Sequence, residues 1–158
     1  GAAPVISLLP WDKVNRLFPR EGIAEVIDLE SGLRFKVKRL FGTNHADVEP
    51  LTAADTEIMK EIWGGFSWER RPVLVYTKDK VLAASMTNMP HAGLDGQPEG
   101  KTVSGRSGGY GTGYNLDKVK GNGMDGVVDL HFKNSTRHMD GKQDPQHQQA
   151  IQKAAGLK

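Results

Sequence analysis

One short segment, residues 126–132, constrains the fold more than any other because its apolar and polar side chains alternate. Alternation with a period of two is typical of a β-strand whose two faces meet different surroundings. The apolar side chains would then face a core, while Asp129 and His131 would lie side by side on the opposite face. The segment therefore predicts a half-buried strand that carries a polar site.

Other segments predict a mixed fold with a largely antiparallel sheet. Four more extended segments form two hairpins around short polar turns: residues 22–30 with 33–40, and residues 72–77 with 81–86. Helices are expected after Pro10, Thr52 and Asp144, where a proline or a capping side chain precedes an apolar stripe. We therefore expect an α+β fold with a mostly antiparallel sheet or small barrel, and helices near the start, in the middle and at the C-terminus.

The length of 158 residues suits one domain. Residues 1–10 are assigned to a linker or an artificial chain end, because they lack the charged and apolar regions of a signal peptide. Residues 11–158 are expected to form a single globular domain.

Composition excludes several classes of function. The net charge of +2 comes from 21 basic and 19 acidic residues mixed along the chain, so the basic stripe of a nucleic-acid-binding protein is missing and no such partner is expected. There is no cysteine, which excludes disulfides, thiolate zinc sites and a cysteine nucleophile. No apolar run of about 18 residues is present, so we expect no membrane span.

Residues 93–126 are expected to form a long glycine-rich loop. A loop of this length in a small domain usually binds a ligand or covers a site. Tyr110 and Tyr114 lie between glycines in this loop, so we expect them to bind substrate by stacking on a sugar ring. The alternative is a flexible insertion. In contrast, Trp63, Phe66 and Trp68 are expected to anchor the core rather than bind a ligand.

Histidines and aspartates recur at close spacing. The pattern Asp-x-His at residues 129–131 has a counterpart, His-x-Asp, at residues 45–47 and again at residues 138–140, while His91 follows a proline. Zinc binds imidazole and carboxylate groups, and a catalytic zinc uses three of them and a water. The alternative is that each histidine is a surface or hydrogen-bonded residue without an ion, because no His-Glu-x-x-His motif is present.

Residues 89–93 and 126–131 together resemble the frame of L,D-transpeptidase domains of the YkuD type. Those domains carry His-Gly on one strand and, downstream, a catalytic strand with the sequence Ser-His-Gly-Cys-Ile-Arg. At the corresponding positions of this chain Val127 replaces the histidine, Asp129 the cysteine and His131 the arginine. Acyl transfer through a cysteine is therefore chemically impossible here, whatever the fold.

The stretch from Trp11 to Ala155 also resembles domains at the C-terminal end of exported Gram-positive cell-wall proteins. Such proteins are often described as fused zinc-dependent amidase, peptidase and peptidoglycan-binding modules. Three segments carry this resemblance, namely residues 43–50, 89–91 and 130–135. It implies a bacterial protein outside the cell or in the cell wall, and peptidoglycan or its peptide and sugar fragments as the partner. It also implies a monomer within a longer chain of several modules.

These observations favour a peptidoglycan-directed domain, with zinc-dependent amidase or peptidase activity as the leading hypothesis. In this hypothesis His91, Asp129 and His131 hold the zinc ion. His45 and Asp47 serve as general base or as a fourth ligand. The alternative is a non-catalytic wall-binding module on an L,D-transpeptidase-like scaffold, which the replaced cysteine favours. The sequence leaves open whether the domain is an enzyme.

Overall fold

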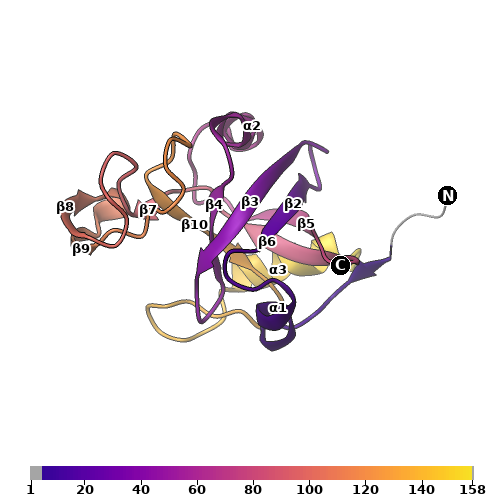
Figure 1. The fold of residues 1–158 in the computed structure, drawn as a ribbon. Coiled ribbons are helices and arrows are strands. Elements are labelled where there is room, and N and C mark those ends of the chain that lie inside the picture. The colour runs from indigo at the N-terminus through magenta and orange to yellow at the C-terminus, as the bar shows by residue number, and fades with distance from the viewer. Residues whose placement is uncertain (1–4, 158) are drawn as a thin grey trace.

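The computed structural model describes residues 5–157 and has the expected α+β class. Among these residues, six strands close into a mostly antiparallel barrel and three α-helices pack around it (Figure 1). The elements are, in chain order, β1 (Ile6–Ser7), α1 (Trp11–Leu17), β2 (Ile23–Asp28), β3 (Arg34–Phe41), β4 (Ala46–Pro50), α2 (Ala53–Trp63), β5 (Arg71–Thr77), β6 (Lys80–Met86), β7 (His91–Ala92), β8 (Thr102–Arg106), the 3-10 turn η1 (Ser107–Gly109), β9 (Gly111–Tyr114), β10 (Gly126–His131) and α3 (Pro145–Ala154).

The barrel closes because β10 pairs with a strand on each side. Around the barrel the order is β2, β3, β4, β10, β6 and β5, and β5 pairs again with β2. β10 runs antiparallel to β4, where Asp129 lies opposite Asp47, and antiparallel to β6, where His131 lies opposite Ser85. The strand that was predicted to carry a polar site is therefore held on both edges.

The alternation predicted for β10 is confirmed. Val128, Leu130 and Phe132 are fully buried in the core of the barrel, and the ring of Phe132 stacks on Trp11 with a centroid distance of 6.1 Å. Asp129 and His131 face the other side of the strand and line a pocket. Burial of the apolar face fixes the register, because a shift by one residue would bury the two polar side chains in the core.

The predicted hairpins β2–β3 and β5–β6 and the predicted helix ends are also confirmed. α2 begins with a capping box, in which the side chains of Thr52 and Asp55 each accept a hydrogen bond from the other's backbone N–H. It ends at Gly64, whose φ of 74° is left-handed. α3 follows Asp144, whose carboxylate accepts a hydrogen bond from the backbone N–H of His147. None of the helices in residues 5–157 is long and apolar enough to cross a membrane.

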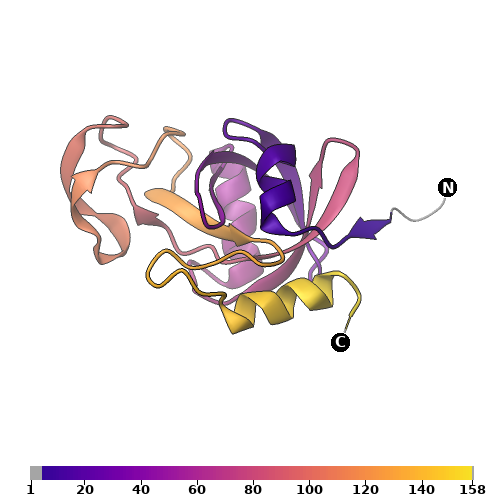
Figure 2. The ribbon, with the colours of Figure 1, turned by 90° about the horizontal axis from the view of Figure 1, so that it is seen from below.

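Two parts of the chain differ from the expectation. β1 pairs in parallel with β6, so the sheet begins before residue 11; residues 1–4 of the expected linker, and residue 158, lie outside the described residues. Residues 93–126, expected to form one long loop, contain the hairpin of β8 and β9 with η1 between its strands. This hairpin projects from one end of the barrel (Figure 1), whereas α3 lies along one side (Figure 2).

Candidate functional site

All five histidines of the chain line one pocket of about 200 Å³. They come from five places in the fold: His45 directly before β4, His91 in β7, His131 in β10, His138 in the loop after β10, and His147 in α3. The fold brings them together because β10 pairs with β4, β6 and β7, and α3 packs on β6. Segments far apart in the sequence thus build a single polar site.

Asp129 is the centre of this site. Its Oδ1 atom lies 3.1 Å from Nε2 of His45 and 3.2 Å from Nε2 of His91. Nδ1 of His45 donates to the carbonyl oxygen of Thr136 at 2.8 Å, and Nδ1 of His91 donates to that of Met89 at 3.1 Å. Because a carbonyl can only accept, both Nδ1 atoms must carry hydrogen. The two imidazoles are therefore oriented alike, with Nε2 directed at the same carboxylate oxygen.

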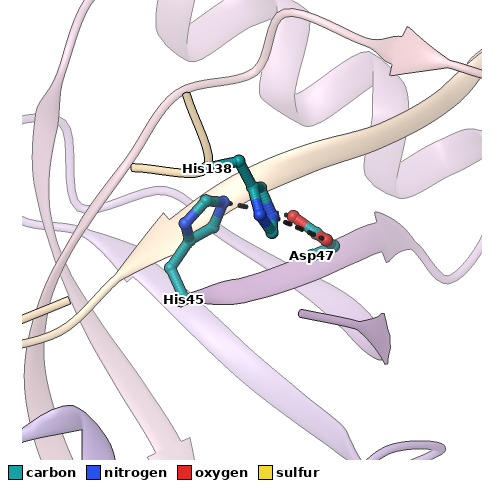
Figure 3. A group of neighbouring side chains, drawn as sticks. All are labelled: His45, Asp47 and His138. Atoms are coloured by element: carbon teal, nitrogen blue, oxygen red, sulfur yellow. Dashed lines mark ion pairs between the residues drawn. The ribbon is translucent and has the colours of Figure 1, made fainter. Parts of the chain in front are cut away.

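A second carboxylate, Asp47, lies beside the first. Its Oδ1 atom is 3.2 Å from Nε2 of His45, and its Oδ2 atom is 3.8 Å from Nε2 of His138. Figure 3 shows both imidazoles facing this carboxylate. Two carboxylates opposite each other on paired strands would repel. The imidazole of His45 lies within 3.2 Å of both and offsets this repulsion.

Charge explains the protonation of this group. Burial alone would lower the pKa of His45, but Asp129 and Asp47 outweigh burial and raise the pKa to about 10. The pKa of His91 is also raised, because Asp129 outweighs the effect of burial there. Conversely, burial would raise the pKa values of Asp129 and Asp47, but the imidazoles that face them lower both. At neutral pH the site therefore holds an imidazolium between two carboxylates.

The other two buried histidines have the opposite character. The rings of His131 and His147 stack with centroids 3.8 Å apart and an interplanar angle of 4°, and His131 also stacks on His45 at 4.2 Å. Burial is the main reason why the pKa of His147 falls to about 4, and burial together with the neighbouring histidines lowers the pKa of His131. Ser85 Oγ lies 2.8 Å from Nδ1 of His147. Two neutral imidazoles thus lie behind the charged one.

Buried polar atoms without a hydrogen-bond partner gather at this site. In residues 5–157 they are Asp47 Oδ1, Arg70 Nε, Thr87 Oγ1 and His131 Nδ1. Asp47 Oδ1 is close to His45 Nε2, but the contact lacks the geometry of a hydrogen bond. The other three residues line the pocket. Buried polar groups are nearly always satisfied, so this concentration indicates a place where a bound group completes the structure.

The described residues contain three groups of three side chains that can hold a metal ion, each with ligand atoms within 4.8 Å of one another. The groups are His45, Asp47 and His138; His45, Asp129 and His131; and Asp47, His91 and Asp129. They overlap, so they are alternatives within one cluster. The predicted trio of His91, Asp129 and His131 is brought into one pocket, but it is not one of these groups.

Aromatic side chains stand on both sides of His91. The ring of Tyr110 lies 5.4 Å from that of His91, and the ring of Trp68 lies 5.8 Å from it. Trp68 is 43% exposed and lines the pocket, and Phe66 is 37% exposed, so the expectation that these two residues anchor the core is wrong; Trp63 does lie in the core. Tyr114, the other predicted substrate-binding tyrosine, packs against Phe41 and does not line the pocket.

The hairpin of β8 and β9 positions Tyr110. The guanidinium group of Arg106 donates hydrogen bonds to the carbonyl oxygens of Tyr110, Gly111 and Tyr114, which fixes the turn. Gly108 has a φ of 71°, and a side chain there would begin 2.8 Å from Cβ of His91. Only glycine lets the turn approach His91 this closely.

Sequence reasoning identified six residues that the pocket or its carboxylates use: His45, Asp47, His91, Tyr110, Asp129 and His131. It did not assign roles to His138 and His147, and it assigned Trp68 to the core. His138 carried a sequence signal, since it repeats the His-x-Asp spacing. His147 carried none, because its contact with His131 depends on how α3 packs on the barrel.

Comparisons with known proteins supply no relative. No family model matches the chain, and neither a curated protein nor a solved structure matches it. The site has to be interpreted from its own geometry.

Proposed function

We propose that this domain is a zinc-dependent hydrolase that cleaves amide bonds of peptidoglycan. The observation that carries the proposal is the shared orientation of His45 and His91, whose Nε2 atoms converge on one oxygen of Asp129 while their Nδ1 atoms donate to backbone carbonyls. Histidines that bind metals almost always donate the other ring N–H in this way.

The donor set fits zinc. Two donors at about 2.0–2.1 Å from a tetrahedral zinc ion lie about 3.3 Å apart. The atoms of His45 and Asp129 are 3.1 Å apart, and those of His45 and Asp47 are 3.2 Å apart. Imidazole and carboxylate are also the ligand types of catalytic zinc sites. We therefore propose that the ion takes its ligands from the cluster of His45, Asp129, Asp47 and His91. None of the three groups contains both His45 and His91, so one of these two histidines binds the ion together with the carboxylates, and His131 stacks on His45.

When bound, zinc would lower the pKa of a coordinated water and polarise the scissile carbonyl group. The chain's own residues do the rest. His138 has a 55% exposed side chain at the rim of the pocket, and Asp47 faces its Nε2 atom at 3.8 Å. An imidazole oriented by a carboxylate is the usual general acid and base, so His138 is placed to take up a proton and deliver it to the leaving amine. This assigns to His138 the role that the sequence suggested for His45 or Asp47.

Two features support peptidoglycan as the substrate. The first is the resemblance of residues 11–155 to domains of exported cell-wall proteins, as the sequence indicated. The second is the pair of half-exposed rings, Trp68 and Tyr110, at the pocket. Such rings offer flat apolar faces on which a sugar ring packs. A location at the bacterial cell wall is part of the same proposal.

The test is product release from purified peptidoglycan. The zinc-loaded protein should release soluble fragments with new amino groups, and a chelator should abolish this activity. Asp129→Asn should abolish it as well, because the variant loses the central carboxylate, whereas Asp79→Asn in the exposed β5–β6 turn should retain full activity. Absence of release from wild-type protein with one bound zinc ion would refute the hydrolase.

A second candidate function is supported by one observation. With its pKa raised to about 10, His45 is an imidazolium between Asp129 and Asp47 and offsets part of their charge without any metal. Such a cluster suits a non-catalytic wall-binding module, in which Asp129 replaces a catalytic cysteine. This module would sediment with peptidoglycan after chelator treatment and would release nothing from it.

A further inference from the structure

A second cavity lies next to the histidine pocket and has no role in the proposed chemistry. It is a groove of about 550 Å³ between α3 and the segment that leads into β5. Trp68 and Arg70 line both the groove and the histidine pocket, so the two are neighbours. A ligand that lies in the groove therefore meets the same two side chains that border the histidine pocket.

One helix joins the two sites. Asp144 and His147, at the N-terminal end of α3, line the histidine pocket, whereas Gln149, Ala150 and Lys153 line the groove. Ten helical residues extend over roughly 15 Å at about 1.5 Å per residue. An extended peptide advances by about 3.3 Å per residue, so about four or five residues would fill this length.

The lining of the groove has the chemistry of a peptide site. Gln146 and Gln149 are exposed, and their side-chain amides can both donate to and accept from a peptide backbone. Trp68, Pro72 and Leu157 provide apolar surface. Within the described residues the side-chain amides of Gln146 and Gln149 form no hydrogen bond, so both are available to a ligand.

The charges of the groove are balanced. Two carboxylates, Glu30 and Glu69, and two cations, Arg70 and Lys153, line it. Within the molecule Lys153 Nζ lies 3.5 Å from Glu30, while Arg70 pairs with Asp144 and Glu69 with Arg71, each at 2.8 Å. A polyanion would gain nothing from such a lining, whereas a peptide with both ammonium and carboxylate groups finds a partner for each. Arg70 also has a buried Nε donor without a partner, at the passage between the two cavities.

We infer that this groove is the peptide subsite of the histidine pocket, and that it binds an extended zwitterionic peptide of four or five residues whose end reaches the pocket past Trp68. One part of this inference rests on the proposed function, namely that the end of the peptide is delivered to a hydrolytic site. Binding of the peptide itself depends only on the groove.

The test is calorimetric titration of the chelator-treated protein with a synthetic pentapeptide that has one lysine residue and free termini. The double variant Gln146→Ala/Gln149→Ala should weaken binding at least fivefold. Gln152→Ala is the matched control, since it removes the same amide from an exposed position of α3 that does not line the groove, and it should bind like wild type. A pentapeptide with capped termini and norleucine in place of lysine should also bind more weakly.

Zinc content and peptidoglycan hydrolysis, measured on the same preparations after incubation with zinc and before the chelator treatment, separate the two proposals. Binding that depends on both glutamines in a protein without zinc supports the groove and rejects the hydrolase. A hydrolase with zinc whose double variant binds the pentapeptide like Gln152→Ala, or wild-type protein that does not bind it at millimolar concentration, overturns the peptide subsite.

Discussion

Asp47 and Glu49 lie two residues apart on β4, on the same face of the strand, yet their surroundings differ completely. Glu49 is fully buried and accepts hydrogen bonds from the backbone N–H groups of Lys118 and Val119, at 2.7 and 3.0 Å, and from the amide of Asn122 at 3.1 Å. The carboxylate of Asp47 instead faces the imidazoles of His45 and His138, and its Oδ1 atom is buried without a hydrogen bond.

The contrast separates a structural carboxylate from a functional one. Burial raises the pKa of Glu49 to about 8, and its donors come from a loop that it holds in place. The pKa of Asp47 is instead lowered, since His138 and His45 outweigh burial. A buried acid that backbone donors saturate stabilises the fold, whereas one that faces titratable side chains in a pocket is available for chemistry.

The largest expected effect is on stability, at Glu49. Glu49→Ala should lower the free energy of unfolding by about 3–5 kcal/mol, because three donors lose a buried acceptor at about 1–3 kcal/mol each. Denaturant unfolding measures this loss. Glu49→Gln is the control, since it retains an acceptor oxygen and should lose much less. The folded fraction of both variants should still bind zinc. If these variants lost zinc binding, Glu49 would be no more structural in its role than Asp47.

Next in size is the response of His45 to its partner. Asp129→Asn removes the charge that, with Asp47, raises the pKa of His45 to about 10, so this pKa should fall clearly. Titration of the histidine side chains by NMR measures the change. In the control Glu49→Gln the pKa of His45 should be the same as in wild type. An unchanged His45 pKa in Asp129→Asn would show that the carboxylate does not govern the site.

The pH dependence of stability provides a third test. The pKa of His45 is raised from 6.5 to about 10, so its contribution is complete below pH 6.5 and is lost as pH rises through 10. The pKa of His147 is lowered from 6.5 to about 4, so the folded state loses stability as pH falls from 6.5 towards 4.

The two histidines should therefore lower the melting temperature of the metal-free protein on both sides of pH 6.5, and Glu49, whose pKa is raised from 4.5 to about 8, should add to the loss between pH 6.5 and 8. Thermal unfolding followed by circular dichroism at a series of pH values checks this. His147→Gln should flatten the acid side of the profile and leave the alkaline side unchanged. A profile that rises steadily from pH 6.5 to 10 would contradict the assigned imidazolium.

The smallest expected effect concerns the turn over His91. Gly108 and Gly109 both have positive φ, 71° and 75°, but only at Gly108 would a side chain meet His91. Each alanine substitution should cost about 1–2 kcal/mol in backbone strain. Gly108→Ala should in addition displace His91, and so shift its NMR signals and weaken zinc binding, whereas Gly109→Ala should do neither. Equal behaviour of the two variants would show that the hairpin does not position the site.

Local features of the fold could be predicted from the sequence, whereas the closure of the barrel could not. The capping box at Thr52 and the alternation around Asp129 depend on residues within a few positions of one another. By contrast, β10 pairs with residues of β4, β6 and β7 that lie 34 to 84 positions away in the sequence, and spacing carries no information over such distances. A hairpin inside a glycine-rich stretch was likewise hidden, because its strands lack apolar alternation.

The same limit explains why the site could be predicted only in part. The pairs at residues 45–47 and 129–131 were visible because their members are two positions apart on a strand. The actual contacts join different strands, such as His45 with Asp129 and His91 with Asp129, so the division into ligands and base could not be predicted. Trp68 was assigned to the core on composition alone, although it follows α2 in a segment that lines the pocket.

The central claim is that the acids facing histidines bind a metal and that the acid facing backbone donors does not. Elemental analysis after dialysis against zinc and then against zinc-free buffer tests it most directly, on wild type, Asp129→Asn and Glu49→Gln. We expect about one zinc per chain in wild type and in Glu49→Gln, and almost none in Asp129→Asn. Wild-type protein without zinc, or Asp129→Asn with as much zinc as wild type, would contradict the account.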